Sequence, residues 1–256
     1  CYGKEAVAGE QVLFSIDGIS SDINASCAEI SDYDKAISCY QLALDVARER
    51  EDPENEIGVL TNIASSYAQL SNYDKALEYY RKAMDITKKA EVVPIWDLNA
   101  LFIGMGLSYM ELGQKENALK YFQKALTENR KNFNLRGEAS CLDLIGRFYV
   151  QQGEYWKGRE SFEKALEIWS GEGAENKGKT LSNLGGIYFQ LGQFNKALEY
   201  FKMALKETED TELKGFLIKG IGQVFAELGY YDEALEYFEL NAMIYAEEIG
   251  REYLKA

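Results

Sequence analysis

Two short amphipathic helices are predicted between Leu181 and Leu205, and no other stretch constrains the fold as strongly. In the first half, apolar residues recur on one helix face: Leu181, Leu184, Ile187, Tyr188 and Leu191. After Gly192 a second apolar face follows: Ala197, Leu198, Phe201, Ala204 and Leu205. An isolated helix of this length is marginal in water, so the pair must pack against neighbouring helices.

The same two-helix pattern recurs along the chain at intervals of 37 to 42 residues. A small residue opens the second helix of each copy: Ala36, Ala76, Ala118, Gly158, Ala197 and Ala234. An aromatic residue follows four positions later: Tyr40, Tyr80, Phe122, Phe162, Phe201 and Phe238. Between the helices, five positions before the small residue, stands a turn residue: Ser71, Gly113, Gly153, Gly192 and Gly229.

The repeated positions have a common physical explanation in helix packing. Small residues let two antiparallel helices approach closely, and a large aromatic side chain fills the gap between one pair and the next. Glycine at the turn ends the first helix because it adopts a positive φ without penalty. Each pair covers its neighbour, so the core is a continuous strip.

This pattern resembles the tetratricopeptide repeat family. The string L-x-x-L-G-x-x-Y followed by G-x-[YF]-x-x-A-x-x-x-[YF]-x-x-A is present, with substitutions, in residues 60–83, 102–125, 142–165, 181–204 and 218–241. The usual unit has ~34 residues, and the copies here are longer. Lys115 replaces the turn aromatic of the third copy, and Lys88 and Arg130 stand where the family has proline. The pattern is similar to the long-repeat branch of kinesin light chains and of cell-polarity and bacterial signalling adaptors.

The resemblance implies an all-α fold, a right-handed superhelical solenoid of six helix-turn-helix repeats with a C-terminal capping helix. We expect an N-terminal segment over residues 1–15 and the solenoid over residues 16–256. The expected repeats cover about 16–50, 56–90, 96–130, 137–169, 177–209 and 214–254.

The net charge of −14 narrows the classes of partner. Contacts to phosphate need clustered lysine and arginine, so nucleic acid is not expected as a partner, nor is adhesion to anionic membranes. No run of 18 apolar residues is present, which argues against a transmembrane helix. The four cysteines lack C-x-x-C spacing and are expected to be unpaired, which favours a reducing, cytoplasmic compartment. Cys1 leaves a lipid anchor as the alternative.

No catalytic, metal or cofactor site is predicted. Histidine is absent, which removes Ser-His-Asp and Cys-His arrangements and imidazole metal sites. Residues 173–180 match the phosphate-binding string G-x-x-x-x-G-K-[ST], with Lys179 and Thr180 at its end. That motif needs a preceding strand, and no strand is predicted, so we interpret the segment as a connection between repeats.

The resemblance implies that the first helix of each repeat lines a concave groove that holds a peptide. The residues expected to contact it are Asn62, Ser65, Ile103, Leu107, Met110, Arg147, Lys179, Asn183, Lys219 and Gln223. Asn62 and Asn183 match the asparagine that family members use to hold a ligand's backbone amide. The third repeat offers an apolar patch, and the cations Arg147, Lys179 and Lys219 predict an acidic ligand.

The predicted function is therefore a non-enzymatic scaffold that binds a protein or peptide in its groove, as a monomer or weak homo-oligomer. One alternative is the sensor or regulatory arm of a larger signalling enzyme. A second is a self-associating structural protein, in which Tyr230, Tyr231 and the terminal helix pack on another copy.

Overall fold

The computed structural model describes residues 32–88, 94–172 and 176–253, and every regular element in these ranges is an α-helix. The expectations for residues 1–15, for the first helix of the first repeat and for Cys1 lie outside the described residues. The chain divides into two compact parts, the N-terminal half up to Asn132 and the C-terminal half from Phe133.

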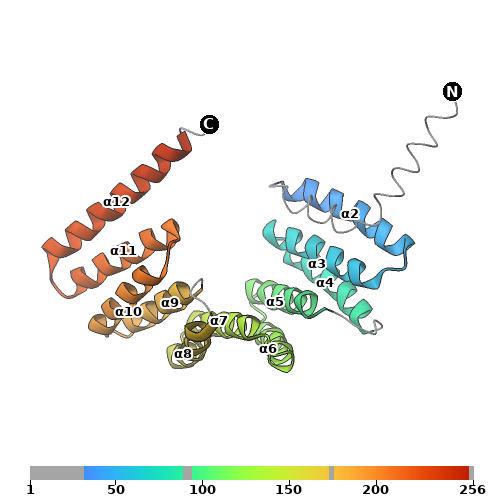
Figure 1. Cartoon of the computed structure of the whole chain (residues 1–256), viewed down its shortest axis with the longest axis horizontal. Helices are drawn as coiled ribbons and strands as arrows, with labels where there is room; N and C mark the ends of the chain where they lie inside the picture. The colour runs from blue at the N-terminus through green and yellow to red at the C-terminus, as the bar shows by residue number, and fades with distance from the viewer. Residues whose placement is uncertain (1–31, 89–93, 173–175, 254–256) are drawn as a thin grey trace. The chain divides into compact units, whose positions relative to one another are not determined.

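The N-terminal half contains five described helices, each beside the next (Figure 1). They are α2 (Tyr33–Glu49), α3 (Pro53–Gln69), α4 (Tyr73–Thr87), α5 (Ile95–Glu111) and α6 (Lys115–Lys131). Every consecutive pair is in contact, and α3 also touches α5. Thus α3 with α4, and α5 with α6, form two of the expected helix-turn-helix repeats, and α2 is the second helix of the first.

The C-terminal half contains six described helices that continue the pattern. They are α7 (Leu135–Gln151), α8 (Tyr155–Glu172), α9 (Lys177–Gln190), α10 (Phe194–Glu207), α11 (Thr211–Glu227) and α12 (Tyr231–Tyr253). Consecutive helices pack together, and the first helices also touch one another, α7 with α9 and α9 with α11. These contacts confirm the predicted all-α repeat architecture within this half.

Local sequence signals explain where the helices begin and end. An Asp or Asn side chain accepts a backbone N–H in the first turn of five helices, at 3.1 to 3.3 Å, from Asp32, Asp52, Asn72, Asn134 and Asp210. The predicted turn residues do adopt positive φ: Gly113 (70°), Gly153 (76°), Gly192 (68°), Gly229 (81°) and also Ser71 (58°). This geometry folds each repeat back on itself.

The two helices of a repeat meet where a glycine faces an aromatic ring. A Cβ built on Gly185 would lie 2.5 Å from the ring of Phe201, which is too close for any side chain. Gly106 faces Phe122, Gly146 faces Phe162 and Gly222 faces Phe238 in the same way. The predicted role of these small residues in close helix approach is confirmed.

A second row of aromatic contacts was not predicted from the sequence. Two rings stack within each of four repeats at centroid distances of 5.1 to 5.5 Å: Tyr67 on Tyr79, Tyr109 on Tyr121, Tyr188 on Tyr200, and Phe225 on Tyr237. The fourth repeat has Ser161 at the second position of the pair. These stacks add to the packing because offset rings attract each other beyond the area they bury.

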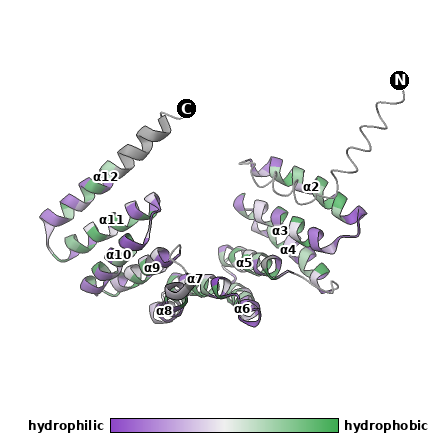
Figure 2. Cartoon of the chain, viewed as in Figure 1, coloured by the Kyte–Doolittle hydropathy of each residue, from purple (hydrophilic) through white to green (hydrophobic). Residues whose placement is uncertain are grey.

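Hydrophobic and hydrophilic residues alternate along the helices, and the hydrophobic ones form the contacts between neighbours (Figure 2). Among the described residues, no helix combines the length and hydrophobicity that a bilayer crossing requires. Cys141 is buried and is not disulfide-bonded. Cys39 takes part in a disulfide, so the prediction of unpaired thiols is wrong for that residue.

Candidate functional site

A pocket of about 620 Å³ opens among the first helices of the last three repeats, α7, α9 and α11. Helix α7 contributes Ser140, Asp143, Leu144 and Arg147. From α9 and its N-cap come Asn176, Lys179, Ser182 and Asn183. The third wall is the start of α11, with Asp210, Glu212, Leu213 and Phe216. The pocket lies entirely within the C-terminal half.

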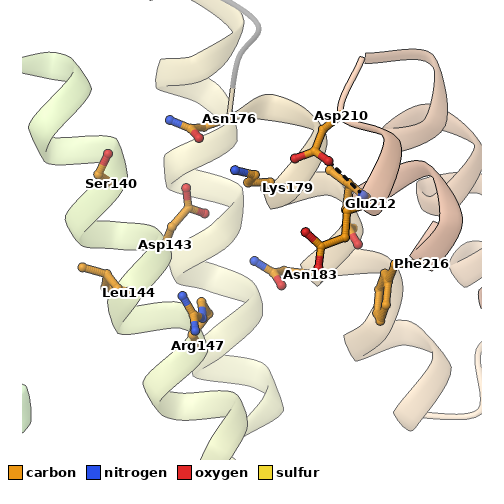
Figure 3. A pocket seen from close by; sticks show the side chains of 12 residues that line it. Ser140, Asp143, Leu144, Arg147, Asn176, Lys179, Asn183, Asp210, Glu212 and Phe216 are labelled. Atoms are coloured by element: carbon orange, nitrogen blue, oxygen red, sulfur yellow. Dashed lines mark hydrogen bonds between the residues drawn. The ribbon is translucent and has the colours of Figure 1, made fainter. Parts of the chain in front are cut away.

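Helical spacing explains why these side chains meet. The α7 residues stand at i, i+3, i+4 and i+7, which places them on one face of the helix. Figure 3 shows Asp143 and Arg147 on one side of the pocket, and Asp210, Glu212 and Phe216 on the other, with Asn176, Lys179 and Asn183 between them. The site is therefore part of the first-helix surface that the repeat pattern predicts.

Asp143 ties three helices together at this pocket. Its carboxylate accepts hydrogen bonds from the Trp169 Nε1–H of α8 at 2.9 Å and from the Thr180 hydroxyl of α9 at 2.8 Å. Burial raises the pKa of Asp143 to about 6, against the opposing effects of these two hydrogen bonds and of the positive charge of Arg147. Near neutral pH, the Asp143 carboxylate therefore accepts the hydrogen bonds from Trp169 and Thr180.

Thr180 is also the last residue of the string, residues 173–180, that matches a phosphate-binding loop. Thr180 is buried, and its hydroxyl is bonded to Asp143. The preceding element is helix α8, and no strand is present in the described ranges. The last four residues of the string, Lys177 to Thr180, belong to α9 and not to a connection between repeats, and residues 173–175 lie outside the described residues.

The α7 and α9 walls carry the groups that remain available to a ligand. The side chains of Arg147 and Lys179 are exposed, and neither forms an ion pair among the described residues. The half-buried Asn183 places its amide beside them (Figure 3). Two cations and an amide converge here, a combination that suits a carboxylate next to a peptide group.

The α11 wall has a different character. Asp210 caps the helix, and its carboxylate accepts the backbone N–H of Leu213 at 3.1 Å. Glu212 is exposed in the first turn, and Phe216 is exposed one turn further on. This side of the pocket therefore offers a negative charge and an apolar surface.

Three of the predicted contact residues come together in this pocket, namely Arg147, Lys179 and Asn183. Lys219 and Gln223 are exposed on the same face of α11 but do not line the pocket. They follow Glu212 and Phe216 at helical spacing, further from the start of the helix.

The other predicted contact residues lie on helices of the N-terminal half. Ser65 of α3 shares a hydrogen bond of 3.0 Å with the Tyr80 hydroxyl, and Asn62 is half-buried one turn earlier. Ile103, Leu107 and Met110 are half-buried on α5. Their contact with a ligand stays a prediction.

Sequence reasoning did not anticipate that the starts of α9 and α11 contribute to the site. Asn176, Asp210 and Glu212 lie at helix N-termini, outside the motif positions that define the repeat. An aspartate just before an apolar-periodic segment is a helix-cap signal, so Asp210 could have been placed at this edge. Among the described residues, no group of three or more potential ligands could hold a metal ion.

Comparison with known proteins gives a consistent result. The tetratricopeptide repeat sequence profiles match residues 25–89, 97–168 and 138–206, and a further one matches residues 220–240. A comparison with curated protein sequences gives no match.

Several solved structures share the fold at low sequence identity. BtubC (BKLC) from P. vanneervenii is 16% identical, with a TM-score of 0.74 over 86% of this chain and 94% of its own. A putative kinesin light chain from Podosopora anserina, with nearly identical TPR-like repeats, is 17% identical, with a TM-score of 0.60 over 74% of this chain and 94% of its own. A chain of the APC/C heterotetramer Cut9–Hcn1 is 17% identical, with a TM-score of 0.62 over 83% of this chain and 37% of its own.

The profile matches cover most of the chain, and the helix pairs, turn geometry and small-to-aromatic contacts are those of the repeat. Such repeats support a role as a protein-interaction scaffold. The chain belongs to the tetratricopeptide repeat family.

Proposed function

We propose that the protein is a non-enzymatic scaffold that binds a peptide segment of a partner protein in the pocket of α7, α9 and α11. A ligand carboxylate contacts Arg147 and Lys179, and the amide of Asn183 holds the adjoining peptide group. The observation that carries this proposal is the convergence in one pocket of an amide and two exposed cations that form no salt bridge within the described part of the chain.

The opposite wall supports a direction for the bound peptide. Leu213 and Phe216 form an apolar surface at the start of α11, beside the carboxylate of Glu212. A ligand therefore directs its acidic group towards α7 and α9, and an apolar side chain towards Phe216. The reverse orientation brings two carboxylates together, which is unfavourable.

The pocket is built from helices, so little order has to be created on binding. Asp143, Trp169 and Thr180 fix α7, α8 and α9 to one another through partly buried hydrogen bonds. A preformed surface lowers the entropic cost of association. This rigidity supports a presenting surface in preference to a moving catalytic element.

The proposal is tested by selecting peptides from a random library against the intact protein and measuring their affinity by calorimetry. We expect the selected peptides to contain Asp, Glu or a free C-terminal carboxylate. Arg147→Glu removes a charge-assisted hydrogen bond of about 1.5–3 kcal/mol, so the affinity should fall about 10- to 100-fold.

A matched variant controls for the change in net charge. Lys206 is an exposed cation on α10 that does not line the pocket, so Lys206→Glu should change the affinity by less than about two-fold. Lys219→Glu then reports whether the ligand extends along α11. Equal losses in Arg147→Glu and Lys206→Glu, or no loss in either, would reject the proposed site.

A further inference from the structure

Helix α12 carries an exposed apolar stripe beside its contact with α11, and the Phe238 ring in that stripe also packs against Gly222 of α11. Tyr231, Leu235, Phe238 and Ala242 follow one another at helical spacing. Tyr231 is 73% exposed, Leu235 56% and Phe238 38%, and Ala242 is exposed as well. Of the helices described, only α11 packs against α12. These four residues form the α12 stripe.

In an earlier repeat, the two central positions of this stripe are buried. The counterparts of Leu235 and Phe238 in α4 are Leu77 and Tyr80, which are 2% and 1% exposed. Helix α5, the first helix of the next repeat, packs against α4 there. The α12 stripe therefore resembles, in its central residues, the surface of α4 that helix α5 covers.

Two of the helices that cover such stripes, α5 and α11, carry a glycine above the aromatic ring. Gly104 of α5 lies so near the Tyr80 hydroxyl that an added Cβ would clash with it. Gly220 of α11 lies above the ring of Phe201, where a Cβ would come within 3.3 Å. A helix that fits over Phe238 as α5 and α11 fit over Tyr80 and Phe201 carries a small residue at the centre of its apolar face.

Charge distinguishes between the candidate occupants of the α12 stripe. Exposed Asp232, Glu236 and Glu239 form a row along one border of it. The segment from Tyr231 to Gly250 contains no lysine or arginine. Two copies of α12 packed face to face would bring these carboxylates together, whereas a basic helix would complement them.

We propose that the α12 stripe binds an amphipathic helix of a partner protein, with a small residue over Phe238 and basic residues beside the acidic row. This helix lies on α12 as α5 lies on α4 and as α11 lies on α10. The interaction is a helix laid along an apolar surface, read by residues at i, i+4 and i+7. It is separate from the pocket of α7, α9 and α11.

The test uses the intact protein and a fluorescein-labelled peptide with the sequence of α11, Thr211–Glu227, as the probe. This peptide carries Gly220 in its apolar face and the cations Lys214 and Lys219. Fluorescence anisotropy should show saturable binding. Leu235→Glu in the protein should weaken binding at least about ten-fold, because a carboxylate replaces the centre of the stripe.

Matched controls separate the stripe from general effects. Leu240→Glu makes the same change on α12, at a leucine that is 44% exposed and off the stripe, and binding should stay within about two-fold. A peptide with Gly220→Ile, and one with both lysines changed to Glu, should each bind at least about ten-fold more weakly. Circular dichroism checks that every protein variant keeps its helix content.

The proposal is overturned if the peptide does not bind, or if Leu235→Glu and Leu240→Glu weaken binding equally. It is also overturned if the Gly220→Ile peptide, or the peptide with both lysines changed, binds as well as the parent. Sedimentation velocity decides the remaining alternative: self-association that disappears in Leu235→Glu would assign the stripe to a second copy of this chain.

Discussion

At the scale of single residues, Asp143 combines a structural and an electrostatic role. Its carboxylate accepts hydrogen bonds from α8 and α9, and burial raises its pKa to about 6. A carboxyl group whose pKa is higher in the folded state binds its proton more tightly when folded. The contribution of Asp143 to stability is therefore full below pH about 4 and is lost as the pH rises to about 6.

Replacing Asp143 with Asn removes this titration. We expect the unfolding free energy of Asp143→Asn, relative to the wild type, to increase by about 1–2 kcal/mol between pH 4 and pH 7. Urea unfolding followed by circular dichroism at several pH values measures it. Glu167→Gln, at an exposed position of α8, serves as the control. Parallel pH curves for the wild type and Asp143→Asn would show that burial does not raise the pKa of Asp143.

At the scale of the helix, two adjacent glycines of α9 have opposite roles. Gly185 faces the ring of Phe201, and a Cβ there would lie 2.5 Å from it. The neighbouring Gly186 has no atom within 4 Å of the position that a Cβ would take. The first glycine is required by the close approach of α9 and α10, while the second only lowers helix propensity.

Alanine substitution separates these two roles within one helix. Gly185→Ala should destabilise the protein by about 1–3 kcal/mol, because Phe201 must move. Gly186→Ala should stabilise it by about 0.5–1 kcal/mol through helix propensity. Chemical denaturation measures both changes. If the two variants shifted stability in the same direction, the close contact between Gly185 and Phe201 would not determine the packing of this repeat.

The helices were largely predictable because the repeat is periodic. The opening small residue, the aromatic four positions later and the turn glycine all have the predicted roles, and each depends on local geometry. The stacked rings, such as Tyr188 on Tyr200, were missed because they join motif positions to positions outside the motif. The hydrogen bonds from Trp169 and Thr180 to Asp143 link three helices, so no spacing along the chain reveals them.

The site was predicted only in part, for a related reason. Arg147, Lys179 and Asn183 were found because they occupy first-helix positions of the repeat. Asp210 and Glu212 were missed because they lie where α11 begins, and the start of a helix depends on its cap more than on the repeat. Their negative charge gives the proposed ligand a direction, with its acidic group towards α7 and α9.

At the scale of the whole molecule, membership of the tetratricopeptide repeat family explains why the chain is built from repeated pairs of helices. The sequence predicts no catalytic site in this acidic chain. A repeat protein is stabilised by contacts between neighbouring repeats, and it presents a row of first helices to a partner. In the C-terminal half, that row is α7, α9 and α11. We propose that a partner peptide binds to this row of helices.

Hydrogen exchange measured by mass spectrometry tests this claim most directly, with the intact protein in the presence and absence of a selected peptide. Amides close to the ligand exchange more slowly because binding suppresses local opening. We expect slower exchange in Leu135–Gln151, in Lys177–Gln190 and in the first turns of Thr211–Glu227, with α10 unchanged. Slower exchange confined to α8 and α10, with no change in α7, α9 and α11, would contradict it.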